Sequence, residues 1–574
     1  MMIQEWRKTC RDRITSNDYA DYIVSYYENR GQLETYFRNE CLKFIDNNLA
    51  IVTIDRADID MMSVIATLYY MVPKCYGLMD TGSIEESGIY KVQNQPVLNL
   101  RGRNVLVGII DTGIDYQNPL FRWADGSTRI EAIWDQTIQA EIPPEGLLYG
   151  SVYSKAQINE ALQTENPLEL VPSQDTNGHG TFAAGIIAGG EDPGNDFTGA
   201  APMADLLVVK LKQAKQYLKD FYFLNGDEVY QETDIIQAVS YLVSEAARLE
   251  KPLSIYIGVG TASGDHAGQG SLNQLLNRIN LAPNFIVSVP AGNEGSARHH
   301  FSGVVTDDKT YREVELNVGA DEPGFVMELW GEVPGTYAIG IESPYGEVVE
   351  RILPLFNRRQ RIDFILERTL VEVAYVLAEE LSGKPLIFIR MVTPREGIWR
   401  FRVFASGNSR NEFHIWLPIR KFLSENTFFL RPDPFITLSD LGTGEGSITA
   451  TAYNHTTGAL YLESSRGYTD DGRVKPDLAA PGVNVYGPAV RERQDAPYGY
   501  IRKSGSSIAA AHAAGAAALL MEWSGRLRLS GTQIRRYLLR GAGRNPEQEY
   551  PNPSWGYGTL DLYGTFERLT QNRS

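Results

Sequence analysis

Short apolar segments alternate with segments of helical periodicity between residues 104 and 298. The apolar segments, rich in Val, Ile and Leu, are residues 105–110, 205–211, 253–257 and 285–290. The helical segments are residues 180–187, 234–248 and 270–279. This alternation predicts an α/β fold, a doubly wound parallel sheet with helices on both faces. The pattern resumes after about residue 436, so we expect one α/β unit that an insertion divides.

Alternating polar and apolar residues mark this insertion, between about residues 304 and 432. Examples are residues 313–318, 337–341 and 399–404, and Gly, Pro and Asn residues separate such segments. A side-chain period of two is typical of half-buried strands. We therefore expect an inserted β-sandwich.

The N-terminal region has a third pattern, in the order β-α-β-β-α-β. Its segments, in that order, are residues 19–26, 32–39, 41–45, 49–54, 59–70 and 72–76. This is the order of the split βαβ, or ferredoxin-like, α+β unit, which many unrelated proteins share. The three patterns together predict four parts, with the boundaries 1–79, 80–303, 304–432 and 433–574.

Net charge and hydropathy limit the possible partners. The 574 residues include 54 Lys and Arg against 71 Asp and Glu, a formal net charge of −17. An acidic surface repels nucleic acid and anionic lipid, so we expect neither nucleic acid nor a membrane as a partner. The first eight residues lack an apolar segment, and the run 508–521 is short for a bilayer. We therefore expect no signal peptide and no membrane span.

The three cysteines, Cys10, Cys41 and Cys75, lie far apart and form no Cys-x-x-Cys motif. Their odd number and their spacing predict free thiols in a reducing compartment. All three precede residue 80, which also favours a separate N-terminal unit.

Three short motifs carry residues suited to catalysis. Asp111 follows the first apolar segment, at the carboxyl end of a strand, where α/β sheets build their sites. His179 lies between two glycines at the start of a small-residue helix. Ser506 and Ser507 begin an Ala-rich helix, whose dipole favours a developing oxyanion. Taken singly, Asp111 is also suited to bind ribose, a metal or a helix end, and either serine to be an N-cap.

The other six histidines lack the setting of His179. His299 and His300 are adjacent, and we expect them to form a surface pair. For His266, His414 and His455 we expect structural roles in loops or strands.

The order of the motifs, Asp then His then Ser, is that of the subtilisin-type triad. Four segments resemble those of the subtilisin-like serine peptidases: Asp111-Thr112-Gly113-Ile114-Asp115, Gly178-His179-Gly180-Thr181, Pro290-Ala291-Gly292-Asn293-Glu294-Gly295 and Gly505-Ser506-Ser507-Ile508-Ala509-Ala510. Ser506 and Ile508 replace the usual Thr and Met of that family, and Ala511 a common Pro. The resemblance covers about residues 1–300 and 436–574.

The resemblance implies a serine endopeptidase and a role for each of these residues. Ser507 would be the nucleophile, His179 the general base and then acid, and Asp111 the group that fixes the His tautomer. Asn293 and the backbone amide of Ser507 would stabilise the oxyanion. No cofactor is implied.

The resemblance also implies how an extended peptide would bind. Residues 254–261 would pair with the substrate backbone, next to the primary pocket. The residues expected to bind substrate there are Gly258, Val259, Gly260, Ala291 and Gly292.

Residues 1–79 resemble the subtilisin prodomain, an intramolecular chaperone and inhibitor that the enzyme removes itself. The segment Tyr76-Gly77-Leu78-Met79 would end in the active cleft. We therefore expect a cut between Gly77 and Thr81, with the bond between Met79 and Asp80 preferred and residues 93–96 as the alternative region. We also expect the prodomain to stay bound without a covalent link.

Two departures from the family pattern lie between Asp111 and His179. Leu120 stands where many subtilisins have a calcium-binding Asp, so we expect no metal there. Residues 121–171 form an additional segment, for which the alternatives are a specificity element, a lid or a passive surface loop.

In organisation, the chain resembles the Csp germination proteases of clostridial spores. These combine such a prodomain with a jelly-roll insertion between the oxyanion Asn and the nucleophile. The resemblance implies a bacterial, cytoplasmic or spore-associated enzyme that activates the precursor of a cortex-lytic hydrolase. The alternatives are a pseudoprotease that binds a partner and an enzyme that its own prodomain holds inactive. The presence of all four residues of the site favours the enzyme.

Overall fold

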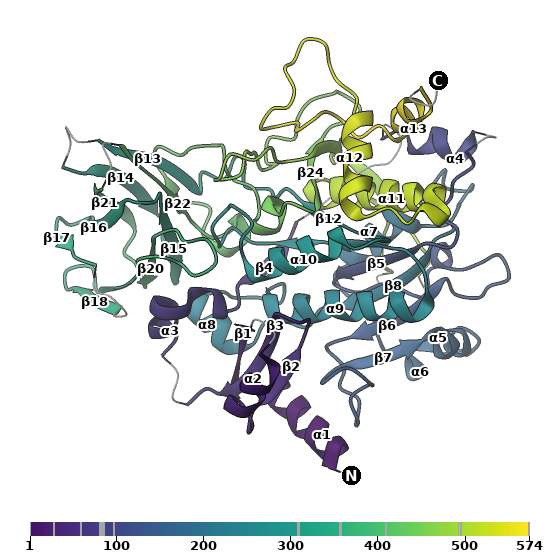
Figure 1. Cartoon of the computed structure of the whole chain (residues 1–574), viewed down its shortest axis with the longest axis horizontal. Helices are drawn as coiled ribbons and strands as arrows, with labels where there is room; N and C mark the ends of the chain where they lie inside the picture. The colour runs from purple at the N-terminus through teal and green to yellow at the C-terminus, as the bar shows by residue number, and fades with distance from the viewer. Residues whose placement is uncertain are drawn as a thin grey trace.

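A computed structural model describes residues 2–26, 29–57, 60–79, 87–95, 98–306, 310–354, 359–407, 410–491, 493 and 496–571. Three groups of elements lie next to one another in Figure 1. A central sheet is covered by helices, a pair of antiparallel sheets lies at its side, and a smaller N-terminal unit lies below both.

The central sheet has eight strands in the order β25-β24-β12-β10-β5-β8-β6-β7. Their bounds are β5 (Leu106–Asp111), β6 (Ile130–Asp135), β7 (Ser151–Ser154), β8 (Asp205–Lys210), β10 (Leu253–Ile257), β12 (Phe285–Pro290), β24 (Ile448–Tyr453) and β25 (Leu478–Pro481). Neighbouring strands are parallel, except that β7 runs antiparallel to β6 at the edge. The prediction of an α/β fold with a largely parallel sheet is confirmed.

Alternate side chains of the strands join two hydrophobic clusters, one on each face of the sheet. In β5, Val107 and Ile109 belong to one cluster and Leu106 and Ile110 to the other. The helices of the first cluster include α7 (His179–Ala188), α11 (Ser506–Ser524), α12 (Gly531–Gly541) and α13 (Leu562–Gln571). Those of the second include α9 (Glu232–Leu249) and α10 (Ser271–Leu281). Helix α11 is buried along nearly its whole length, which accounts for its many alanines.

Residues 121–171 contribute two strands to the central sheet. Strand β6 lies between β8 and β7, and its Trp134 is fully buried. Two short helices, α5 (Lys155–Ala161) and α6 (Pro167–Leu170), follow β7. The expectation of a lid or a surface loop is wrong for β6, because its apolar side chains fill both faces of the sheet.

Two antiparallel sheets, on the left of Figure 1, are formed by the chain between residues 300 and 429. The six-stranded sheet has the order β13-β22-β15-β20-β19-β18 and the five-stranded sheet the order β17-β16-β21-β14-β23. Their bounds are β13 (His300–Thr306), β14 (Arg312–Val318), β15 (Gly324–Gly331), β16 (Thr336–Glu342), β17 (Val348–Ile352), β18 (Arg359–Phe364), β19 (Thr369–Val376), β20 (Leu386–Val392), β21 (Gly397–Ser406), β22 (Arg410–Trp416) and β23 (Phe428–Phe429). One hydrophobic cluster contains side chains of both sheets, such as Phe325 of β15 and Phe401 of β21. The two sheets therefore share a core.

The N-terminal unit contains the three-stranded antiparallel sheet β1-β3-β2. Its elements are α1 (Met2–Thr15), β1 (Tyr19–Ser25), α2 (Arg30–Tyr36), β2 (Cys41–Phe44), β3 (Leu49–Asp55), α3 (Met61–Leu68) and β4 (Cys75–Leu78). Helix α1 is not predicted by the sequence patterns. Strand β4 leaves the sheet and pairs antiparallel with β9 (Tyr230–Gln231) and β11 (Val259–Gly260). The predicted ferredoxin-like sheet is therefore wrong in its last strand, whose backbone finds its partners in the larger unit.

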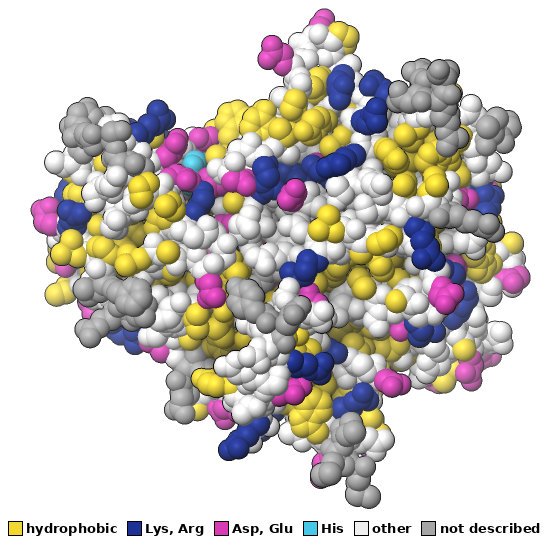
Figure 2. Space-filling view, viewed as in Figure 1, with side chains coloured by type: hydrophobic (Ala, Val, Ile, Leu, Met, Phe, Trp, Pro, Cys, Tyr) yellow, Lys and Arg dark blue, Asp and Glu magenta, His cyan; other side chains and the backbone are white. Residues whose placement is uncertain are grey.

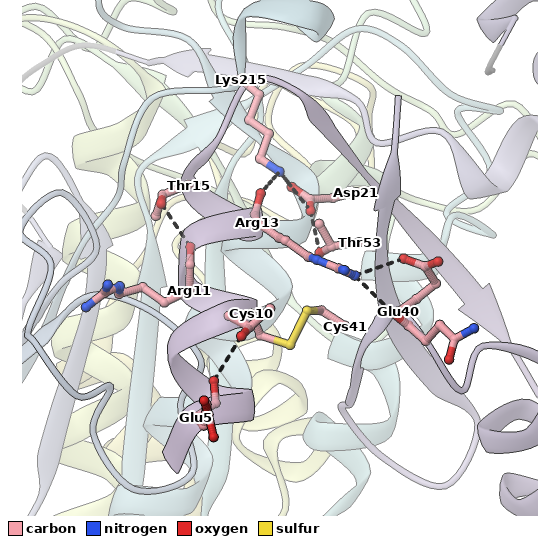
Figure 3. Close-up of a disulfide and its surroundings, with 12 residues drawn as sticks. Glu5, Cys10, Arg11, Arg13, Thr15, Asp21, Glu40, Cys41, Thr53 and Lys215 are labelled. Atoms are coloured by element: carbon pink, nitrogen blue, oxygen red, sulfur yellow. Dashed lines mark hydrogen bonds and ion pairs between the residues drawn. A yellow bond between two sulfur atoms is a disulfide. The ribbon is translucent and has the colours of Figure 1, made fainter. Parts of the chain in front are cut away.

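Helix α1 brings Cys10 next to Cys41 of β2, and the two form a disulfide with Cα atoms 5.4 Å apart (Figure 3). The prediction of three free thiols is wrong for this pair, because it did not include the helix that brings them together. Among the described residues, Cys75 is a free cysteine, and burial raises the pKa of its thiol. Because disulfides persist mainly in oxidising compartments, the cysteines no longer indicate a reducing one.

The N-terminal unit packs against both larger parts of the molecule. Figure 1 shows α3 next to α8 (Gln216–Tyr222), below the antiparallel sheets. One hydrophobic cluster contains Ile65 of α3, Leu218 of α8 and Phe388 of β20. Three segments that are distant in the sequence therefore share this core.

Three histidines stack with Trp416 where the antiparallel sheets meet the central unit. The ring centroids of His266 and Trp416 are 3.9 Å apart, and Nε2 of His300 lies 2.9 Å from Nδ1 of His414. The expected surface pair is wrong, because His299 and His300 are only 7% and 1% exposed. The ring of His299 lies 3.0 Å from the carboxylate of Glu294, and the ring of His300 stacks on Trp416, so both rings are enclosed.

Helix α4 (Ile89–Asn94) and the antiparallel hairpin of β26 (Val485–Pro488) and β27 (Tyr500–Lys503) are further described elements. Within the part of the chain that the structure describes, none of the helices has both the length and the apolar character needed to cross a bilayer. On the face drawn in Figure 2, basic and acidic side chains are interspersed among uncharged ones.

Candidate active site

Asp111 and His179 meet at the carboxyl edge of the central sheet. Asp111 is the last residue of β5, and His179 is the first residue of α7. Nδ1 of His179 lies 2.7 and 2.8 Å from the two carboxylate oxygens of Asp111. An ionised carboxylate at Nδ1 holds the proton on that nitrogen, so Nε2 is the atom that accepts a further proton.

Ser507 lies on the other side of the same imidazole ring. It is the second residue of α11 and is fully buried. Its Oγ lies 3.3 Å from Nε2 of His179. The structure therefore brings together three side chains that the sequence separates by 68 and 328 positions. An alcohol next to an imidazole that is oriented by a carboxylate can be activated as a nucleophile.

Asn293 follows β12 and lies at the N-terminus of α11. Its side-chain oxygen accepts a hydrogen bond from the backbone amide of Ser506, at 3.1 Å. The hydroxyl of Ser506 in turn accepts one from the amide of Gly292, also at 3.1 Å. These two hydrogen bonds hold the loop after β12 against the helix end that carries Ser507. The helix dipole favours negative charge at this end.

Three of the predicted substrate-binding residues follow β10. Val259 and Gly260 form β11, where Val259 is opposite Leu78 and Gly260 is opposite Gly77. The carbonyl of Gly258 accepts a hydrogen bond from the amide of Met79, at 3.4 Å. This backbone edge therefore carries an extended antiparallel segment, which belongs to the N-terminal part of the same chain.

Gly258 also lies against the carboxylate of Asp111. A Cβ at this position would overlap Oδ2 of Asp111 and lie 2.9 Å from the hydroxyl of Tyr256. Glycine at this position therefore leaves room for the carboxylate that contacts the imidazole.

The other two predicted residues, Ala291 and Gly292, lie in the loop after β12. Ala291 is fully buried, and its carbonyl accepts a hydrogen bond of 2.7 Å from the amide of Ser439. Ser439 reaches the edge strand, since a Cβ on Gly260 would lie 3.1 Å from its Cβ. The loop after β12 is therefore linked to β11 through Ser439.

Met79, the residue after β4, lies next to the imidazole of His179. Its carbonyl oxygen lies 3.4 Å from Nε2 of His179. The side chain of Met79 is 2% exposed and packs in a cluster with Ala262 and Ile419. Asp80, the other residue of the expected cleavage site, lies outside the described residues.

Asp175 organises the site, although the sequence analysis did not single it out. Its carboxylate accepts hydrogen bonds from the hydroxyl of Thr112 at 2.8 Å and from the amide of Gly178 at 2.8 Å. It also accepts from the amide and the hydroxyl of Thr181, at 2.8 and 2.7 Å. The carboxylate of Asp175 therefore holds Thr112, which follows Asp111, and Gly178, which precedes His179. The signal in the sequence is an Asp three residues before the glycine that precedes a helix, a pattern typical of a side-chain turn.

Leu120 is buried, and its carbonyl oxygen has protein partners. It accepts hydrogen bonds from the amide of Gly190 at 2.8 Å and from the guanidinium of Arg129 at 2.6 Å. Arg129 is 1% exposed and also donates to the carbonyls of Ala188 and Ala204. In the described ranges, no group of three or more His, Cys, Asp or Glu side chains is arranged to hold a metal ion.

The fold and the Asp–His–Ser arrangement define the class of protein. The sequence profile of the subtilase family matches residues 102–322 and 384–558, more than half of the chain. The chain therefore belongs to the subtilase family, a family of serine peptidases.

Individual curated proteins match parts of the chain at lower sequence identity. The chain is 24% identical over 485 residues to the minor extracellular protease Vpr of Bacillus subtilis (strain 168), covering 81% of this chain and 52% of Vpr. It is 27% identical over 242 residues to an intracellular serine protease of Paenibacillus polymyxa, covering 41% of this chain and 55% of that protein. The chain thus spans about half the length of these curated relatives.

Among solved structures, the CspB protease of Clostridium perfringens is similar, with a TM-score of 0.75 and 32% sequence identity. The match covers 85% of this chain and 97% of that one. The resemblance to the Csp proteases is confirmed by this likeness.

Proposed function

We propose that this chain is a serine endopeptidase with Ser507, His179 and Asp111 as its triad. The observation that carries the proposal is the unbroken contact between the three side chains. Asp111 lies 2.7 Å from Nδ1 of His179, and Ser507 lies 3.3 Å from Nε2 of the same ring. Membership of the subtilase family supports the same roles.

In the proposed mechanism, Oγ of Ser507 attacks the peptide carbonyl carbon while its proton passes to Nε2 of His179. Asp111 stabilises the imidazolium that forms. The side-chain amide of Asn293 and the backbone amide of Ser507 stabilise the oxyanion, and losing one such donor raises the barrier by about 3 to 4 kcal/mol. His179 then protonates the leaving amine, and water releases the acyl group by the same route.

We further propose that residues 1–79 are a prodomain that the enzyme cuts off after Met79. The catalytic domain would then comprise residues 80–303 and 433–574. Two observations support this: β4 pairs with β11 as a substrate would, and the carbonyl of Met79 lies 3.4 Å from Nε2 of His179. The bond between Met79 and Asp80 is the one that would be broken.

Buried ion pairs support retention of the prodomain after this cut. Asp21 of β1 lies 3.0 Å from Lys215, and both side chains are 3% exposed (Figure 3). Lys74, just before β4, lies 3.3 Å from the buried Asp440. Both pairs join residues 1–79 to the rest of the chain, as does the hydrophobic cluster that contains Ile65, Leu218 and Phe388. Separation would break both pairs, so the prodomain is expected to stay bound and to limit activity.

For residues 304–432 we propose a jelly-roll-like domain that limits access to the site. The shared core of its two sheets supports a single folded unit. Its Ile419 packs against Met79, next to the proposed cleavage site. A unit fixed there restricts which peptides can enter.

The proposed substrate is a protein precursor that is activated by limited proteolysis, such as the zymogen of a spore cortex-lytic enzyme in a bacterium. The likeness to CspB and the domain order support this proposal. A second candidate is a regulatory binding protein that has the triad but is held inactive by its prodomain. Because Met79 lies at the site, the inactive state is favoured for the protein until the prodomain is displaced.

Labelling with a fluorophosphonate probe tests the proposed activity. The probe is applied to the purified protein before and after displacement of the N-terminal fragment with mild denaturant. We expect labelling of the wild type, increased by displacement, and none of Ser507→Ala. Labelling that persists in Ser507→Ala, or a wild type that is not labelled in either state, would contradict the proposal.

A further inference from the structure

The segment after β22 lies against the tail that occupies the active site. A Cβ on Gly77 would lie 2.7 Å from Cδ1 of Ile419 and 3.2 Å from Cζ of Phe422. Real Cβ atoms essentially never approach other atoms to 2.7 Å, so a side chain at this position requires the Cδ1 methyl of Ile419 to shift. Gly77 is two residues before Met79, the residue at the proposed cut.

The backbone does not require glycine at this position. Gly77 lies in β4, opposite Gly260, and has no positive φ. Any L-residue adopts such a strand conformation without strain. The requirement for glycine therefore comes from the space next to Ile419 and Phe422.

The segment that limits this space is held in place. The carboxylate of Glu294, the residue after Asn293, accepts hydrogen bonds from the backbone amide of Arg420 at 3.0 and 3.1 Å. The amide of Leu417 donates to the carbonyl of His299 at 2.9 Å. Ile419 is itself 2% exposed. It can move away from a new side chain only by disturbing the cluster in which it packs.

The same cluster defines the pocket of the cleaved residue. The side chain of Met79 packs with Ala262 and Ile419. A Cβ on Gly260 would lie 3.0 Å from Cε of Met79, so glycine at 260 makes room for a long side chain. Ile419 therefore contacts two substrate positions at once, the residue that is cut and, through its Cδ1, the glycine two residues earlier.

We propose that Ile419 and Phe422 make glycine a required residue two positions before the cut. This inference rests on the proposed self-cleavage, and it extends to substrates in trans. The substrate class is an extended protein segment with the order glycine, any residue, then a long unbranched apolar residue at the cut. The specificity comes from the inserted unit, not from the central sheet.

Cleavage of full-length variants tests this inference. The cut fraction of the chain is measured by intact mass at equal times of expression. We expect Gly77→Val to reduce the rate of cutting at least tenfold, whereas Leu78→Val, which places the same side chain one residue later, is cut at close to the wild-type rate. Adding Ile419→Ala to Gly77→Val is expected to restore cutting. A Gly77→Val chain that is cut like the wild type would overturn the inference.

Fluorophosphonate labelling distinguishes exclusion of the tail from misfolding. A Gly77→Val chain that is uncut but labelled has an intact site from which the tail is excluded, as we expect. If it is uncut and unlabelled, the double variant decides: restored cutting supports the inference, and continued failure overturns it. A wild type that is not cut, or a Ser507→Ala chain that is cut, contradicts the proposed self-cleavage instead, so the two failures are distinguishable.

Discussion

The space between Gly258 and Asp111 is small enough that one methyl group would close it. A Cβ at Gly258 would overlap Oδ2 of Asp111, the carboxylate that contacts Nδ1 of His179. Gly258→Ala is therefore expected to displace the carboxylate and to reduce the rate of fluorophosphonate labelling about 100-fold, the usual cost of about 1 Å of misplacement. The control is Gly499→Ala, since a Cβ there meets nothing within 4 Å. Labelling of Gly258→Ala at the wild-type rate, with both melting temperatures unchanged, would rule this account out.

Arg129 is a second residue whose contribution can be measured. Its guanidinium is buried, burial lowers its pKa to about 10, and it donates to three backbone carbonyls. Arg129→Met would leave those carbonyls without this donor, at about 1 to 3 kcal/mol each, partly offset because a buried charge is removed. We expect a loss of about 3 kcal/mol in the free energy of unfolding, measured by denaturant titration.

A matched variant at an exposed position is the control for Arg129→Met. The exposed Arg536→Met should change the free energy of unfolding by less than about 0.5 kcal/mol.

Excess chelator should leave the melting temperature of the wild type unchanged, because Arg129 and Gly190 donate hydrogen bonds to the carbonyl of Leu120. A drop of about 10 °C or more with chelator would show that a bound metal ion stabilises the fold.

At this scale the sequence predicted the residues that lie in compact motifs. Asp111, His179 and Ser507 each stand in a short segment whose neighbours are diagnostic, so their meeting at one point could be expected. Ile419 could not be expected, because its importance comes from contacts across the fold. The local turn at Asp175 has a signal in the sequence, but that signal does not indicate the contact with Thr112. The disulfide of Cys10 depended in turn on a helix that no pattern indicated.

At the scale of elements, a buried group of charges joins β25 to α12. Asp477, next to β25, lies 2.6 Å from Nζ of Lys475 and 2.5 Å from the guanidinium of Arg535 in α12. Burial raises the pKa of Asp477, but the two cations outweigh it and hold the pKa below its usual value. Burial lowers the pKa of Lys475 to about 7. Below about pH 7 the carboxylate therefore neutralises two cations, of which Lys475 is fully buried.

We expect Asp477→Asn to destabilise the protein more than Lys475→Met. The first change leaves the guanidinium of Arg535 without its carboxylate and Lys475 without its ion-pair partner, and it should cost about 3 to 5 kcal/mol in the free energy of unfolding. The second leaves Asp477 paired with Arg535 and bonded to the amide of Thr449, at 2.8 Å. Urea titrations of the three proteins measure both. Equal losses for the two variants would contradict the account.

The elements themselves were predictable where the hydrophobic period was regular. The strands and helices of the central sheet, and the antiparallel strands that interrupt it, follow periods that the sequence displays. Strand β4 and strand β6 were not correctly assigned, because their pairing depends on which edge is available in the folded protein. A short segment such as Cys75–Leu78 carries no information about its partner.

For the whole molecule, acid stability depends on the histidines where its parts meet. Burial lowers the pKa of His266 to about 4, and its ring stacks on Trp416. Asp470 raises this pKa, whereas Lys74 and His414 lower it. The unfolded chain binds this proton below about pH 6.5 and the folded protein only below about pH 4. Stability is therefore present above pH 6.5 and is lost as the pH falls from 6.5 towards 4.

The variant His266→Phe isolates this effect, because Phe can keep the stacking and does not titrate. At pH 7.5 the variant should be less stable, since it loses the hydrogen bond to the carbonyl of Ala262. Between pH 6.5 and 4 the difference should shift in favour of the variant, by at most about 1.4 kcal/mol per pH unit. Buried acids such as Asp440, whose pKa burial raises to about 7, act in the opposite direction in both proteins and cancel in the difference. A difference that does not change with pH would contradict the prediction.

The central claim is that Ser507 cuts its own chain after Met79, whose carbonyl lies 3.4 Å from Nε2 of His179. Intact-mass measurement of the purified wild type and of Ser507→Ala tests it most directly. The account predicts two fragments from the wild type, residues 1–79 and residues 80–574, and a single uncut chain from Ser507→Ala. A wild type that remains uncut, a cut at another bond, or cutting that persists in Ser507→Ala would contradict it.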